Sequence, residues 1–111
     1  MRRVVVTGIG ALTPIGNNFG QYVEGLKNGI SGAGPITRFD ASLFKVRFAC
    51  ELKQFDIEQF MPRKDARRLD PFAQYAMVVA DEAMQMSGLD PEKIDLDRAG
   101  VIWGTGIGGF E

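Results

Sequence analysis

The sequence predicts an α/β protein with a parallel sheet, and three segments carry this prediction. Residues 4–6 form a valine run that stops at a glycine turn, as a strand buried in a parallel sheet does. Residues 71–87 form a long apolar helix, and residues 99–103 form a second buried strand that again runs into glycines. Strands and helices in this order favour an α/β layer.

The helix over residues 71–87 has signals at both ends. Asp70 is a capping residue, Pro71 occupies the first helical position, and Gly88 supplies a C-terminal cap. The segment is rich in alanine and methionine, and only two of its residues are charged. A helix this apolar is expected to be buried on most sides, with its methionines filling the core.

The remaining elements are shorter. A helix is expected over residues 17–28, with Asn17 or Asn18 as its cap. Residues 46–52 alternate in polarity and predict a short strand. Two short helical turns are expected as well, over residues 56–60 and 62–69.

Composition and charge exclude several classes of protein. The 111 residues suit one domain, and a hydrophobic share of 45% argues against disorder. The net charge of -1 gives no global field for nucleic acid, so no nucleic-acid partner is expected. No signal peptide and no membrane segment are expected, and a single cysteine fits a reducing cytoplasm.

The chain has no histidine, which removes the usual nucleophile pairs, most zinc sites and the commonest general base. If the protein is an enzyme, its proton chemistry is therefore expected to depend on carboxylates or lysines, or these residues are not the whole enzyme; no metal site and no cofactor are expected. Cys50 lies in the expected strand over residues 46–52, beside Phe48 and Ala49. It is interpreted as a buried structural cysteine, since no histidine or helix N-terminus is expected nearby to activate it.

The glycines after the first strand raise the hypothesis of dinucleotide binding. Gly8 and Gly10 have the Gly-x-Gly spacing of such a turn. The third glycine is replaced by Thr13, Pro14 follows at once, and no acid lies near residues 29–34, where the ribose partner is expected. The glycines are better interpreted as structural, and dinucleotide binding stays as a less favoured alternative.

Four blocks together resemble one family. They are RVVVTGIGALTPIG at residues 3–16, FDAS at 39–42, RKDARRLD at 63–70 and GTGIGG at 104–109. In this order they are similar to bacterial β-ketoacyl-acyl-carrier-protein synthases of the type II elongating class, and the resemblance covers essentially all 111 residues. It implies a thiolase-like fold with five α/β/α/β/α layers, of which residues 1–111 are the N-terminal, incomplete part of the first half.

The resemblance also implies an activity. Members of the family are cytoplasmic homodimers of fatty acid biosynthesis, acyltransferases that condense malonyl-acyl-carrier-protein with an acyl thioester and release carbon dioxide. Their nucleophilic cysteine and two histidines lie beyond the last residue of this chain in the family pattern, so this part alone is expected to catalyse nothing. A non-catalytic partner subunit that sets chain length is the alternative in another functional class.

Two non-catalytic roles carry over by resemblance. Lys64, Arg67 and Arg68 match the family's docking patch for the acidic acyl carrier protein, and their spacing places three cations on one helical face. Ile107, between Gly106 and Gly108, matches the residue that gates the acyl tunnel. Phe110 is expected to line the tunnel or to lie in the dimer contact, with simple packing as the alternative.

Overall fold

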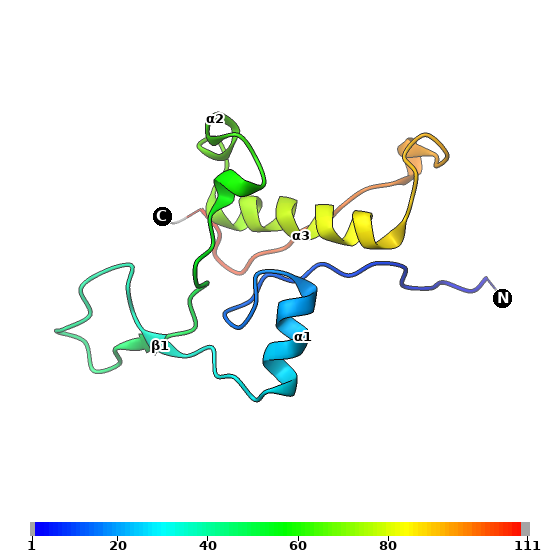
Figure 1. Cartoon of the computed structure of the whole chain (residues 1–111). Coiled ribbons are helices and arrows are strands. Elements are labelled where there is room, and N and C mark those ends of the chain that lie inside the picture. The colour runs from blue at the N-terminus through cyan, green and yellow to red at the C-terminus, as the bar shows by residue number, and fades with distance from the viewer. Residues whose placement is uncertain (1, 110–111) are drawn as a thin grey trace. The chain divides into compact units, whose positions relative to one another are not determined.

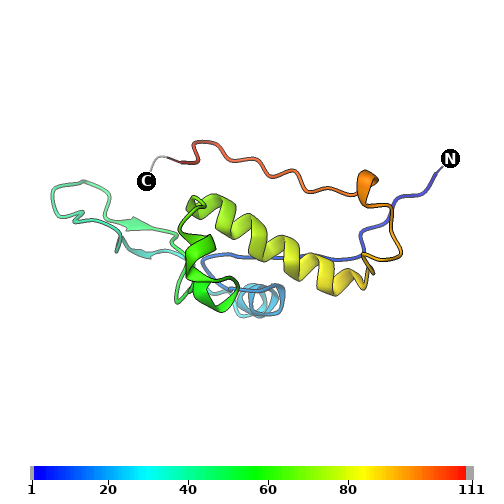
Figure 2. The ribbon, with the colours of Figure 1, turned by 90° about the horizontal axis from the view of Figure 1, so that it is seen from above.

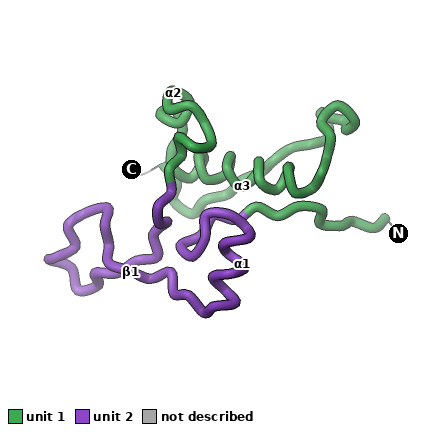
Figure 3. Tube along the Cα trace, viewed as in Figure 1, with its two compact units in different colours: residues 1–10, 56–111 green, residues 11–55 purple. Residues whose placement is uncertain are grey.

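A computed structural model describes residues 2–109 of the chain. The chain divides into two compact units, residues 1–10 with 56–111 and residues 11–55 (Figure 3). The elements along the chain are shown in Figure 1. Phe110 lies outside the described residues, so its expected role is untested by the structure.

The unit of residues 11–55 contains the first helix, α1 (Phe19–Lys27). This confirms the helix predicted over residues 17–28 and selects Asn18 as its cap, since the Asn18 side chain accepts the Gln21 N–H at 2.8 Å. The one buried residue of α1 is Gly25, where an added Cβ would lie 2.9 Å from the Ile15 carbonyl oxygen. The preceding loop therefore packs directly on the helix backbone.

The same unit holds a small sheet of β1 (Gly34–Pro35) and β2 (Phe48–Ala49). The strands are antiparallel, with Gly34 opposite Ala49, and β2 covers only two residues of the strand predicted over residues 46–52. Within residues 2–109, the pairing of β1 with β2 and an isolated bridge between Thr13 and Gly16 are the only β-type pairings. The predicted parallel sheet is therefore not formed in this part of the chain.

A lysine joins separate loops of that unit. Lys53 Nζ donates to the Pro14 carbonyl at 3.0 Å and to the Gly32 carbonyl at 2.7 Å. In return, Asn17 Nδ2 donates to the Lys53 carbonyl at 2.8 Å. These bonds connect the loops at both ends of α1 to the segment that follows the sheet.

The other unit is built around α3 (Pro71–Ser87). The helix begins and ends where the sequence predicts: Pro71 takes the first position, and Gly88 adopts the left-handed conformation with φ 65°. Asp70 caps it through its backbone, because its carbonyl accepts the N–H groups of Ala73 at 2.9 Å and Gln74 at 3.0 Å. Its side chain makes no capping bond.

Three short helical turns accompany α3. They are η1 (Ile57–Gln59), α2 (Arg63–Ala66) and η2 (Leu96–Arg98). The first two confirm the turns predicted at residues 56–60 and 62–69, in shorter form. The side chains of Asp56 and Asp95 begin η1 and η2 by accepting the N–H two residues ahead.

Residues 6–10 and 100–103 lie along α3 (Figure 2), and neither the segment 4–6 nor the segment 99–103 forms a strand. Both were predicted as buried strands, and Val4 is instead 94% exposed and Ile102 fully exposed. A buried strand needs hydrogen-bonded neighbours and an apolar layer on each face. Within residues 2–109 neither segment has such a neighbour, so the prediction of buried strands is wrong for this structure.

Two further burial predictions are wrong. Val78 is the one buried residue of α3, and Met77 is 57% exposed, so the helix is not buried on most sides. Cys50 is exposed, because β2 ends one residue before it and no layer covers it. In both cases an apolar composition was read as burial, which depends on partners far away in the chain.

The glycines after the first valine run have a packing role. A Cβ added at Gly8 would collide with the Ala83 carbonyl oxygen, and one added at Gly10 with that of Val79, both on α3. Between them, the Ile9 N–H points to Met86 Sδ at 3.3 Å. Neither glycine has a positive φ. The interpretation as structural glycines is confirmed, and the reason is close approach to a helix.

Replacing Gly8 or Gly10 by alanine should lower the stability of the full-length protein by about 1–3 kcal/mol, since the methyl group has no room against the α3 backbone. The check is chemical denaturation with the change in midpoint read at constant slope. Gly100→Ala is the matched control, because nothing lies within 4 Å of its added Cβ. Equal losses for all three variants would contradict the close approach.

Candidate functional site

The first candidate site is a cationic turn made by Lys64, Arg67 and Arg68. Lys64 lies in α2, and Arg67 follows the helix with φ -65° and ψ -12°, still in the right-handed helical region. The Arg67 N–H bonds the Arg63 carbonyl at 3.1 Å, and the Arg68 N–H bonds that of Asp65 at 3.0 Å. The backbone thus stays helical, which keeps the three cations within one turn, as predicted from their spacing.

All three cations of this turn are exposed and without an ion pair among the described residues. Their neighbour Arg63 differs, because its Nε lies 3.2 Å from Glu58 Oε1. Asp65 and Asp70, the acids near them in sequence, make no ion pair with them in the described part of the chain. The turn therefore presents uncompensated positive charge to solvent.

One side chain fixes the cationic turn to α3. Gln74 Nε2 donates to the Ala66 carbonyl at 2.9 Å and to the Leu69 carbonyl at 3.0 Å, in a partly buried position. Ala66 itself is 4% exposed. The backbone of the turn is thus fixed by a hydrogen-bonded amide, while its charged side chains remain exposed to solvent.

The second candidate site is the glycine loop of residues 104–109. Ile107 is 75% exposed, and an added Cβ at Gly106 would meet nothing within 4 Å. At Gly108, by contrast, an added Cβ would lie 2.6 Å from Phe72 Cδ1 and 2.5 Å from Thr105 Cγ2. The loop is therefore open around Ile107 and closely packed one residue later.

The structure brings the two candidate sites to the same end of α3. The cationic turn directly precedes Asp70, and the glycine loop packs on Phe72 in the first turn of the helix. In Figure 1 the C-terminal segment and α2 lie at that end of α3. The sequence does not predict this proximity, because residues 72 and 108 are far apart in the chain.

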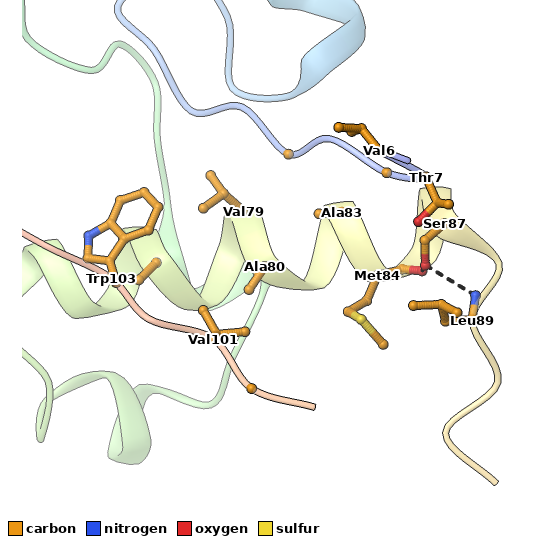
Figure 4. A pocket seen from close by; sticks show the side chains of 14 residues that line it. Val6, Thr7, Val79, Ala80, Ala83, Met84, Ser87, Leu89, Val101 and Trp103 are labelled. Carbon is orange, nitrogen blue, oxygen red and sulfur yellow. Dashed lines mark hydrogen bonds between the residues drawn. The ribbon is translucent and has the colours of Figure 1, made fainter. Parts of the chain in front are cut away.

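An apolar groove lies between residues 6–10, α3 and residues 100–103 (Figure 4). Its volume is about 440 Å³, and Val79, Ala83 and Trp103 are among its lining residues. None of the lining residues is titratable, and the Ser87 hydroxyl is engaged with the Met84 carbonyl at 2.7 Å. The groove suits apolar contact and offers no acid–base group. The sequence analysis did not identify this groove, and the alanines along α3 are the signal that could have indicated it.

The described residues contain no group of three or more metal-ligating side chains, and none of their helices has the length and apolar character to cross a membrane. Three carboxyl groups with a shifted pKa lie outside the cationic turn, the glycine loop and the groove. The Ser42 backbone N–H lowers the pKa of Asp40, the Thr37 hydroxyl lowers the pKa of Glu51, and the Lys93 ammonium lowers the pKa of Asp90.

Comparison with protein families gives a match over the whole chain. The model of the β-ketoacyl synthase N-terminal domain matches residues 1–111. A 3-oxoacyl-[acyl-carrier-protein] synthase 2 of Synechocystis is 48% identical over 110 residues, 99% of this chain and 26% of that protein. The protein of the same name from Staphylococcus aureus strain COL is 47% identical, over 99% of this chain and 27% of its own length.

Solved structures agree with the sequence match. The ishigamide ketosynthase/chain length factor superposes with a TM-score of 0.72 at 38% identity, covering 84% of this chain and 23% of that chain. The complex AntDE:AntF, a type II PKS acyl-carrier protein with its ketosynthase, gives a TM-score of 0.65 at 28% identity, over 88% and 24%. The chain spans about a quarter of the length of the curated relatives it matches.

Proposed function

Since the chain belongs to the β-ketoacyl synthase family, in its N-terminal domain, we propose that it is the N-terminal part of an elongating acyltransferase of fatty acid biosynthesis. The reaction is the decarboxylative condensation of malonyl-acyl-carrier-protein with an acyl thioester. One observation carries the proposal: identity of 47–48% over nearly the whole chain to proteins named 3-oxoacyl-[acyl-carrier-protein] synthase 2.

The chemistry is assigned to residues outside this chain. In the condensation, the malonyl group loses carbon dioxide, its α-carbon bonds to the acyl carbonyl, and the thiol that held the acyl group leaves. A thiolate nucleophile and basic groups must serve these steps. The chain has no histidine, and we do not assign the nucleophile to Cys50. We propose that a cysteine and two histidines elsewhere in the full-length protein act here, as the family resemblance implies.

The larger architecture is also a proposal. The solved neighbours are ketosynthases and support a thiolase-like fold. In five α/β/α/β/α layers, residues 1–111 form part of the first half. A homodimer in the cytoplasm, without cofactor, is the proposed state of the enzyme.

The cationic turn is the proposed docking surface for an acyl carrier protein. Its charge is exposed and uncompensated among the described residues, which is the complement of an acidic partner. The structural neighbour AntDE:AntF is a ketosynthase in complex with an acyl-carrier protein, which supports a partner of this class. Gln74 holds the backbone of the turn, so the three charges are presented from a fixed base.

The glycine loop is the proposed wall of the acyl tunnel, with Ile107 as its gate. Gly106 and Gly108 flank Ile107, and a Cβ added at Gly106 would meet no described atom within 4 Å, so there is open space on that side of Ile107. A branched apolar side chain suits contact with an alkyl chain. Phe110 is proposed as a further lining residue on the resemblance alone.

A non-catalytic partner subunit is the second candidate function. One solved neighbour is named ketosynthase/chain length factor, so the family context includes a factor of that kind. Both candidates share the docking surface and differ in the nucleophile. Dinucleotide binding is not proposed, because Gly8 and Gly10 are used in contact with α3.

The full-length protein should convert malonyl- and acyl-acyl-carrier-protein into the 3-oxoacyl product and carbon dioxide. The measurement is mass spectrometry of the carrier-bound product together with trapped carbon dioxide. If the protein binds the carrier but forms product only when a second subunit is present, it is the chain-length partner. Absence of product under both conditions would overturn the proposed family function.

Reversing the charge of Lys64, Arg67 and Arg68 to glutamate should weaken carrier-protein binding about tenfold or more and flatten its dependence on salt. Surface plasmon resonance at two ionic strengths measures both effects. Lys93→Glu and Arg98→Glu are controls, since they change exposed cations outside the turn. Unchanged affinity of the triple variant, or equal loss in the controls, would exclude the docking role.

Replacing Ile107 by phenylalanine should shorten the products, because the larger ring narrows the tunnel. The kcat/KM for long acyl substrates is expected to fall about tenfold or more, with little change for short ones. Ile107→Val, which removes one methyl group, is the control, and its kcat/KM for long acyl substrates should stay close to that of the wild type. The same profile of chain lengths for the phenylalanine variant and the wild type would rule out the gate.

A further inference from the structure

We propose that Phe72, in the first turn of α3, is a positioning residue that fixes the glycine loop and so contributes to selectivity for acyl chain length. This inference rests on the proposed function, in which Ile107 bounds the acyl tunnel. Its own basis is a contact between residues 72 and 108 in which none of the docking charges takes part.

The contact is a close approach of an aromatic ring to a glycine backbone. A Cβ built at Gly108 would lie 2.6 Å from Phe72 Cδ1 and 2.7 Å from Cε1, and 2.5 Å from the Thr105 methyl group. Real Cβ contacts are essentially never under 3.0 Å. Gly108 is therefore enclosed between the ring of α3 and the beginning of its own loop, and no other residue fits without movement.

The next residue is constrained as well. Gly109 has φ 79°, the left-handed region that favours glycine, and an added Cβ there would lie 3.0 Å from Asp70 Oδ2. Asp70 and Phe72 both belong to the start of α3. Two successive residues at one end of the loop are thus held by the same helical turn.

The other end of the loop has no such contact. Added Cβ atoms at Gly104 and Gly106 meet nothing within 4 Å. Ile107, between the open and the enclosed part, is 75% exposed. The space beside Gly106 is open, whereas the volume of the Phe72 ring limits the positions that Gly108 can take. The position of the Ile107 side chain therefore depends on Phe72.

The helical turn that carries Phe72 is itself fixed. The Asp70 carbonyl accepts the N–H groups of Ala73 and Gln74, at 2.9 and 3.0 Å. The Gln74 side chain bonds the Ala66 and Leu69 carbonyls, at 2.9 and 3.0 Å. Phe72 is half-buried within this bonded segment. A rigid base of this kind is what a positioning residue requires.

The contact is tested first by stability in the full-length protein, with a double-mutant cycle. Gly108→Ala should lower Tm by about 1–3 °C, whereas the matched control Gly106→Ala should leave Tm unchanged. In a Phe72→Ala background, Gly108→Ala should cost less, because the ring is gone and only the Thr105 methyl group still opposes the added methyl group. Equal effects of the two glycine variants, or a cycle without coupling, would overturn the contact.

Selectivity is tested next, by kcat/KM for acyl-carrier-protein substrates of increasing chain length. Phe72→Ala should change the ratio of long to short substrates about threefold or more, with carrier-protein affinity unchanged. Met77→Ala, an exposed position on the same helix, is the control. An unchanged ratio would refute the selectivity role even if the cycle shows coupling.

The two experiments also separate the inference from the proposed function. A wild-type protein that forms no product with or without a second subunit refutes the function, and the stability cycle still decides whether Phe72 holds the loop. A wild-type protein that condenses, combined with an uncoupled cycle, refutes the Phe72 contact alone.

Discussion

The contact that organises the larger unit is the approach of residues 8–10 to the backbone of α3. Gly8 and Gly10 bring an extended segment onto the carbonyls of Ala83 and Val79, where any side chain would collide. The apolar groove exists because this segment and residues 100–103 both run along the same helix. The first turn of that helix supports the cationic turn and the glycine loop, so α3 is the common base of the unit.

The elements that could be predicted from the sequence are those whose signals are local. Both long helices begin and end within a residue or two of the predicted positions, because Asn18, Pro71 and Gly88 act on neighbouring backbone groups. The strands could not be placed in the same way. Residues 4–6 and 99–103 have strand composition, yet hydrogen bonding and burial depend on neighbouring strands and layers, which residues 2–109 do not place beside them.

The same distinction between local signals and contacts of distant residues applies to the candidate sites. The spacing of Lys64, Arg67 and Arg68 predicted a common helical turn, and the backbone through Arg67 confirms it. The contact of Phe72 with Gly108 had no local signal, since the two residues are joined only by the fold. At Cys50 a local signal is misleading. Its apolar neighbours in the sequence predict burial, but the residue is exposed.

The two hydrogen bonds from Gln74 have a consequence for how the family can vary in length. They reach carbonyls at residues 66 and 69 from one amide, so the segment between α2 and α3 has a fixed number of residues. A single insertion there would move the charged turn out of register with the amide. Residues 36–47 connect β1 to β2 and are largely exposed, so a change in length is expected to cost less stability there than between α2 and α3.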